Sequence, residues 1–160
     1  TTRSHVWHHD RKIAAEAVRV PGREPWILHP HGDTEPAVGA PESVQILLLD
    51  GSWNETATLA RETAGWGRRV CLPMSGVSRY WLRDQQEGAR FSTAEALVFL
   101  LRAFGLRAAG DLLALQLELH VYAHLRARGL KMEAEQFLVR SPLREAMPEL
   151  LAQMNTPRPR

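Results

Sequence analysis

Three short apolar runs in the first half of the chain predict three strands. The run VQILLL at residues 44–49 is too short to cross a membrane and is typical of a strand covered on both faces of a parallel sheet. Shorter runs at 26–29 and 69–72 predict two further strands. The first half of the chain therefore predicts an α/β fold with a mostly parallel sheet.

Helical periodicity dominates the rest of the chain. Leucine, valine and alanine recur at helical spacing, which predicts helices over 93–104, 106–127 and 132–139, with a bend at Gly110. An amphipathic stretch at 7–18 predicts one helix before the strands. We therefore expect a helical C-terminal part at about 105–140.

Two helix starts carry the spacing of a capping box. Ser52 with Glu55, and Ser92 with Glu95, place a hydroxyl three residues before a carboxylate. The first predicts a helix from Trp53 to about residue 64, which Gly65 ends, and the second predicts the start of the helix at Thr93. Free N–H groups at such a start suit an anionic ligand.

Each predicted strand is followed by a loop, after His29, Leu49 and Leu72. The carboxyl ends of parallel strands lie at one edge of a sheet, where ligands of open α/β sheets bind. Asp50 follows the second strand, so it is either an ordinary turn residue or a carboxylate that faces a ligand. Further along, SRYWLR at 78–83 interleaves cationic and aromatic side chains that can hold a base and a phosphate.

Composition and charge narrow the class of protein. The 160 residues are enough for one domain, which we expect to span 1–160, and no apolar stretch is long enough to cross a bilayer. The single cysteine excludes an internal disulfide and the start lacks an apolar signal segment, so we expect a cytoplasmic protein. A net charge of +2 and a flexible basic tail at 155–160 are weak evidence for a nucleic-acid partner.

Clustered histidines raise the alternative of a metal site. His5, His8 and His9 lie beside Asp10, and His29 and His31 flank a proline. No cysteine lies near the first cluster, which falls in a terminal segment. We therefore expect no metal site.

Four motifs, in their order and spacing, resemble the DTW-domain family, which contains tRNA-uridine aminocarboxypropyltransferases and is named for an Asp-x-Thr-Trp motif. They are Leu-x-Pro at 28–30, DGSW at 50–53, Tyr-x-Leu-Arg at 80–83 and Ser-Thr-x-Glu-Ala at 92–96. The resemblance covers about 26–104, and the first twenty residues match the family poorly and lack its cysteine-rich segment. Ser52 stands where the family usually has threonine, which keeps the hydroxyl of the cap.

The resemblance implies a SPOUT-like, three-layer fold, usually knotted, that binds S-adenosylmethionine at the strand-end loops. It implies transfer of the 3-amino-3-carboxypropyl group of S-adenosylmethionine to N3 of a tRNA uridine, which releases methylthioadenosine. The sulfonium already activates the carbon under attack, so the enzyme must mainly orient the reactants and accept the N3 proton. We expect Asp50 to be this base, partly buried beside Trp53 with its pKa raised.

The expected site residues fall into two groups. Cofactor binding is expected of Leu28, Pro30, Asp50, Gly51, Ser52, Trp53, Tyr80, Leu82, Arg83, Ser92, Thr93 and Glu95. RNA contacts are expected of Arg79, Arg90, Arg158 and Arg160. Whether Arg83 and the Ser92 helix start hold the cofactor's carboxylate or an RNA phosphate is open at this point.

The expected partner is tRNA, with no membrane and no obligate protein partner, and a monomer is slightly favoured. Two other kinds of function fit the same motifs. One is a different transferase, either a SPOUT-like RNA methyltransferase or an aminocarboxypropyltransferase that acts on ribosomal RNA. The other is an inactive RNA-binding module.

Overall fold

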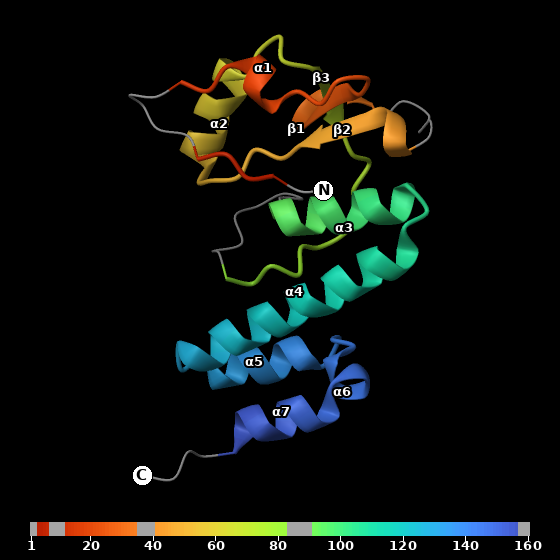
Figure 1. The fold of residues 1–160 in the computed structure, drawn as a ribbon. Coiled ribbons are helices and arrows are strands. Elements are labelled where there is room, and N and C mark those ends of the chain that lie inside the picture. The colour runs from red at the N-terminus through yellow and green to blue at the C-terminus, as the bar shows by residue number, and fades with distance from the viewer. Residues whose placement is uncertain (1–2, 7–11, 35–40, 83–90, 157–160) are drawn as a thin grey trace. The chain divides into compact units, whose positions relative to one another are not determined.

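A computed structural model describes residues 3–6, 12–34, 41–82 and 91–156 of the chain, with only the backbone at Trp53 (Figure 1). The chain divides into two compact units, one of residues 1–73 and one of residues 74–160. The first contains a sheet and the second contains helices, so the protein is a mixed α/β molecule.

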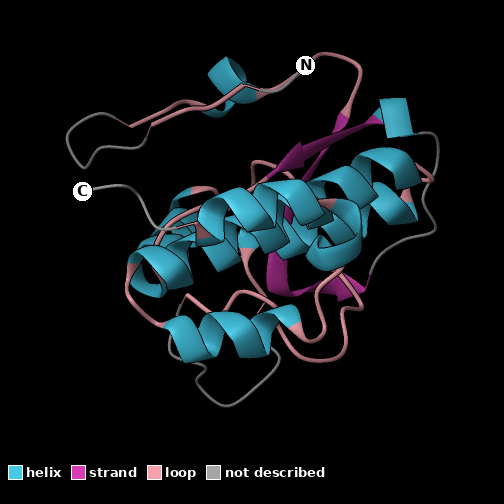
Figure 2. Cartoon of the chain, turned by 90° about the horizontal axis from the view of Figure 1, so that it is seen from below, coloured by secondary structure: helices cyan, strands magenta, loops and turns pink. Residues whose placement is uncertain are grey.

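Three parallel strands form the sheet of the first unit (Figure 2). Their order is β2-β1-β3, with β1 at Glu24–Thr34, β2 at Val44–Leu47 and β3 at Arg68–Cys71. Trp26 and Ile27 of β1 are buried, as are Val44 of β2 and Val70 of β3. The three predicted strands and their parallel arrangement are confirmed, because each apolar run supplies side chains to this core.

The central strand extends beyond its predicted end. We expected a loop from Pro30, but β1 continues to Thr34, and its pairing with β3 is interrupted only between Leu28 and Asp33. Pro30 lies in this interruption, where no N–H is needed for the ladder. Pairing resumes because Gly32 has no side chain: a Cβ there would lie 2.7 Å from backbone atoms of Arg69 and Val70.

Helices of the first unit are shorter than predicted. The predicted helix at 7–18 is confirmed only at its end: α1 covers Ala15–Val18, and residues 12–14 are not helical. The four-residue α1 has no side-chain cap, and a turn this short has little stability of its own. The short 3-10 helix η1 (Pro41–Ser43) precedes β2, and α2 (Trp53–Glu62) follows the strand as predicted.

Five helices make up the described part of the second unit. They are α3 (Thr93–Ala103), α4 (Arg107–Ala127), α5 (Lys131–Leu138), α6 (Leu143–Ala146) and α7 (Pro148–Asn155). Figure 1 shows α3, α4, α5 and α7 stacked in chain order. The three predicted helices are confirmed, and α6 and α7 are two further helices that the pattern did not predict.

α4 is continuous from Arg107 to Ala127, so Gly110, where a bend was predicted, does not interrupt the helix. Gly110 is buried, and a Cβ there would lie 3.3 Å from the carbonyl oxygen of Val98 and 2.9 Å from Cγ of Arg102. The glycine therefore allows α4 to approach α3 closely.

The hydrophobic core of the second unit lies between α4 and the helices after it. Its buried side chains are Val121, Tyr122, Leu125, Ala134, Phe137, Leu138, Leu143 and Leu151. Tyr80, Trp81 and Leu82, which precede the helices in sequence, pack against this core. Within the described residues, no helix has the length and apolar character needed to span a membrane.

Candidate functional site

The turn between β2 and α2 carries Asp50, Gly51 and Ser52. The β2 ladder ends at Leu47, so the chain leaves the sheet before it reaches Asp50, which is exposed. The predicted partial burial of Asp50 is therefore wrong. A Cβ at Gly51 would lie 3.0 Å from Cβ of Glu55, so the glycine lets this turn close tightly on the first turn of α2.

The predicted capping box at the start of α2 is confirmed. The Glu55 N–H donates to Oγ of Ser52 over 3.4 Å, and the Ser52 N–H donates to Oε2 of Glu55 over 2.7 Å. Hydrogen bonds from the Ser52 side chain and then from its backbone lower the pKa of Glu55. The positive end of the α2 dipole thus already has an anion beside it.

The predicted capping box at the start of α3 is also confirmed, and it is more extensively bonded. The Glu95 N–H donates to Oγ of Ser92, which is 8% exposed. Oε2 of Glu95 accepts the Ser92 N–H over 2.7 Å, and the Ser78 hydroxyl donates to the same oxygen over 2.9 Å. We expected the Ser92 N–H to hold an external anion, but the carboxylate of Glu95 takes this place.

The Arg79 side chain forms an ion pair within the second unit. Its Nε and one terminal nitrogen donate to the two carboxylate oxygens of Glu118 over 2.7 and 2.6 Å. The guanidinium carbon lies 4.0 Å from the centre of the Phe137 ring. We expected Arg79 to meet a polyanion outside the pocket, but its guanidinium is directed at α4 and α5.

The Tyr80-x-Leu82 motif packs against the helical core of the second unit. The Trp81 ring between them meets the Phe137 ring edge-on, with 5.4 Å between ring centres. At the end of this stretch, Arg128, which follows α4, donates to the carbonyl oxygen of Leu82 over 3.3 Å. The end of α4 therefore contacts the backbone of Leu82.

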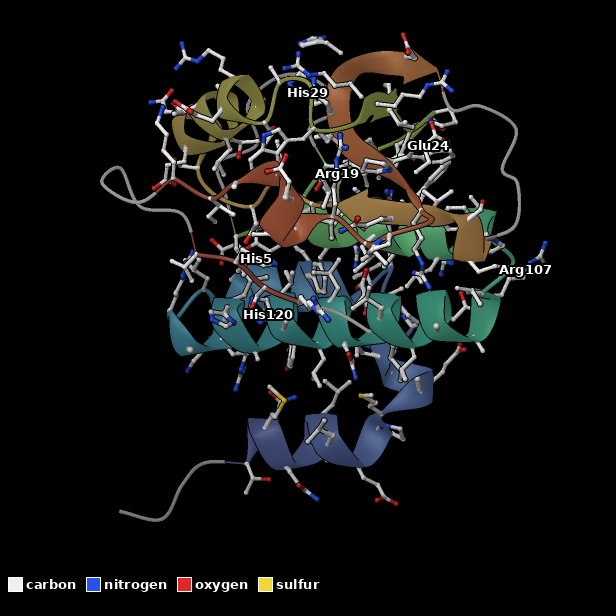
Figure 3. The ribbon with its side chains drawn as sticks, turned by 45° about the horizontal axis from the view of Figure 1, so that its top comes forward. His5, Arg19, Glu24, His29, Arg107 and His120 are labelled. Carbon is white, nitrogen blue, oxygen red and sulfur yellow. The ribbon has the colours of Figure 1, made fainter. Side chains whose placement is uncertain are left out.

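The Leu28-x-Pro30 motif lies at the interruption between β1 and β3, and its middle residue, His29, is labelled in Figure 3. Here the His31 N–H donates to Nδ1 of His29 over 3.1 Å, which places the proton of a neutral His29 ring on Nε2. Burial, the charge of Arg69 and the neighbouring His31 lower the pKa of His29 below 6.5. A neutral imidazole is therefore favoured beside the motif.

The structure brings two sets of predicted residues together, each within its own unit. Leu28 and Pro30 lie on the strand next to the one that precedes Asp50, Gly51 and Ser52. Tyr80 and Leu82 lie in the segment joined through Ser78 and Arg79 to the Ser92–Glu95 cap. The remaining predictions on Arg83, Arg90, Arg158, Arg160 and the Trp53 side chain fall outside the described residues.

The sequence patterns did not single out Glu118. It lies on the buried face of α4 together with Val121, Tyr122 and Leu125, spaced three and four residues apart. A carboxylate in such a stripe indicates a buried partner, because an unpaired charge is costly there. That signal identifies Glu118 as unusual, but its partner, Arg79, lies 39 residues away in sequence.

Two surface hollows of the described chain lie away from the predicted residues. One is lined by residues of 4–6 and 12–17, and the other by residues of α5 to α7. Among the described residues, no three His, Cys, Asp or Glu side chains are grouped as metal ligands.

Comparison with known proteins identifies the family. The family model of the DTW domain matches residues 2–127, a span that begins earlier and ends later than the resemblance at 26–104. The match thus extends over most of the first twenty residues, although they lack the cysteine-rich segment. No curated protein and no solved structure matches the chain. Because the match covers most of its length, the chain belongs to the DTW-domain family, which is known for enzymes that modify tRNA.

Proposed function

We propose that this chain transfers the 3-amino-3-carboxypropyl group of S-adenosylmethionine to N3 of a uridine in tRNA. The observation that carries the proposal is the DGSW turn at the carboxyl end of β2 in a parallel sheet, within the family match. Ligands of open α/β sheets bind at this edge.

In this proposal, Asp50 accepts the N3 proton of the uridine. Its exposed position leaves the carboxylate accessible to a substrate. Gly51 and Ser52 set the direction of the turn, and the indole of Trp53 stacks on a base or on the adenine. Leu28 and Pro30 lie on β1, the strand next to β2.

Charged groups among the described residues suit the charged groups of S-adenosylmethionine. Carboxylates at Asp50 and Glu55 suit its cationic sulfonium and ammonium groups, whereas the Ser92 N–H is committed to Glu95. We therefore assign the cofactor's carboxylate to Arg83 and Thr93, and assign Tyr80, Leu82, Ser92 and Glu95 to supporting this part of the second unit. Arg90, Arg158 and Arg160 contact RNA phosphates.

When bound, S-adenosylmethionine supplies a carbon activated by its sulfonium: the N3–C bond forms, the C–S bond breaks, and methylthioadenosine leaves. The chain's own task is to hold this carbon near N3 and in line for attack, which accounts for much of the rate. Asp50 takes the proton from N3 as the new bond forms.

The wider proposal is a single SPOUT-like, knotted domain over 1–160 that acts as a cytoplasmic monomer. The family match supports one domain, because it runs from the first unit into α4 of the second. The single cysteine, Cys71, forms no disulfide, which fits a reducing compartment.

The test is incubation of the purified chain with bulk tRNA and S-adenosylmethionine labelled in the aminocarboxypropyl group. We expect label in a uridine nucleoside after digestion, and methylthioadenosine as the other product. S-adenosylhomocysteine as the other product would indicate a methyltransferase. Label in ribosomal RNA but not in tRNA, when both are offered, would indicate an aminocarboxypropyltransferase that acts on ribosomal RNA. Absence of cofactor binding by calorimetry would favour an RNA-binding module.

A further inference from the structure

Arg79 joins two helices of the second unit through its side chain. Its guanidinium binds both carboxylate oxygens of Glu118 on α4, over 2.7 and 2.6 Å. It also donates to the carbonyl oxygen of Phe137 on α5 over 3.1 Å, and its central carbon lies over the Phe137 ring. This two-pronged geometry fixes the direction of the guanidinium, not only its distance.

The pair is shielded from water. Only 11% of the Glu118 side chain and 27% of the Arg79 side chain are exposed. Removing one partner of such a pair leaves a charge in a poorly solvated place, which is costly. A second arginine–carboxylate pair between helices of this unit, Arg102 with Asp111, is half or more exposed on both sides. The two pairs join the same kinds of group, but the Arg102 nitrogens both contact one oxygen of Asp111, and this pair is far more exposed.

The backbone of Arg79 connects in another direction, to the start of α3. Its N–H donates to Oε1 of Glu95 over 2.6 Å, and Glu95 accepts the Ser92 N–H on its other oxygen. Arg79 thus binds α4 and α5 through its side chain and the cap of α3 through its backbone N–H.

The same helix fixes the other end of the motif segment. Glu118 holds Arg79, and Arg128, ten residues later at the end of α4, donates to the carbonyl oxygen of Leu82. Tyr80, Trp81 and Leu82 pack on the core between these two attachments. Residues 79–82 are therefore hydrogen-bonded to α4 and its C-terminal end at both of their ends.

We infer that Arg79 and Glu118 are positioning residues, which orient the Tyr80-x-Leu82 motif and the Ser92 helix start for cofactor binding. That the motif binds the cofactor rests on the proposed function. The anchor, by which we mean the contacts of Arg79 with Glu118, Phe137 and Glu95, rests on the distances above. Arg79 is then not an RNA contact, because its positive charge is already compensated by Glu118.

Three variants test the inference. Arg79→Lys keeps the charge but loses the two-pronged geometry. Glu118→Gln keeps the shape but loses the charge. The double variant Arg79→Met with Glu118→Met leaves no buried charge, so the chain can still fold. Arg102→Lys and Asp111→Asn are the matched controls on the exposed pair.

Three measurements are made on each variant: hydrogen exchange of the Arg79 and Ser92 amides by NMR, steady-state kinetics, and tRNA binding over a salt series. We expect exchange at both amides to accelerate about tenfold or more in all three variants, as the free energy of local opening falls. We expect kcat/KM for S-adenosylmethionine to fall on the order of a hundredfold, because a small misplacement of the reacting groups lowers the rate by about this factor. The salt slope of tRNA binding should stay unchanged, and the controls should match the wild type.

Three results would overturn the inference. The first is unchanged amide exchange in Arg79→Lys and in the double variant. The second is tighter tRNA binding in Glu118→Gln together with normal binding in Arg79→Lys. This result would mean that the Arg79 guanidinium, once released from Glu118, contacts a phosphate of the RNA. The third is accelerated exchange with normal kcat/KM, which would make the pair merely structural. If the wild type transfers no group at all, the proposed function fails, and the exchange data alone then decide whether the anchor exists.

Discussion

Asp50 is the residue on which the proposed chemistry depends. Replacing it with asparagine keeps its size and polarity but removes the base, so transfer should fall on the order of a hundredfold or more. Affinity for S-adenosylmethionine should change little, which calorimetry measures beside single-turnover rates. Asp33→Asn is the matched control, because Asp33 is an exposed aspartate of the same unit that pairs with Arg68 over 3.5 Å. Equal turnover in Asp50→Asn and wild type would exclude the base role.

His29 should make stability depend on pH. Its pKa in the folded chain is lowered from 6.5 by burial, by Arg69 and by His31. The unfolded chain therefore binds more protons, and stability is lost as the pH falls from about 6.5 toward the folded pKa. His29→Gln should flatten this part of the pH profile of the unfolding free energy. In NMR titrations, His31→Gln should raise the pKa of His29; a wild-type value at or above 6.5 would contradict the prediction.

At the scale of elements, the close approach of β1 to β3 depends on Gly32. A Cβ at this position would lie 2.7 Å from backbone atoms of Arg69 and Val70, which move only if the strand pairing is disturbed. We expect Gly32→Ala to lower the free energy of unfolding by about 1–3 kcal/mol, the usual cost of overpacking. Urea denaturation measures this value.

Gly110→Ala is the comparison for Gly32→Ala. Its closest contact, at 2.9 Å, is Cγ of Arg102, which belongs to a flexible side chain. Alanine also favours a helix interior over glycine by about 1 kcal/mol. The loss of stability at Gly110 should therefore be much smaller, and equal losses at the two glycines would contradict the role of the backbone atoms around Gly32.

For the whole molecule, the basic residues should separate into two classes. Changing Arg90, Arg158 and Arg160 to alanine should weaken tRNA binding. The slope of log affinity against log salt concentration should also fall by about one for each phosphate that is no longer bound. Turnover at saturating tRNA should survive. Arg83→Ala should instead lower turnover, because the reacting molecule loses a charge-assisted hydrogen bond. Affinity over a salt series, beside single-turnover rates, separates the classes; a reversed pattern would exchange the two assignments.

The local elements followed from the sequence wherever neighbouring residues decide the conformation. Both capping boxes formed at Ser52 and Ser92 because their hydroxyl and the carboxylate three residues later need only each other. The three strands formed at their apolar runs because each run has side chains to bury. The helix at 7–18 was overpredicted because its periodicity supplied neither a cap nor a buried residue in α1.

Tertiary structure alone decided which groups near the candidate site remain accessible to a ligand. The sequence places Asp50 after a strand, but its exposure follows from the point at which the β2 ladder ends. The sequence shows Arg79 as one of several arginines, and only the fold brings it to Glu118, 39 residues away. The physical reason is range: caps and periodicity act within a few residues, whereas burial and ion pairing depend on segments that only folding brings together.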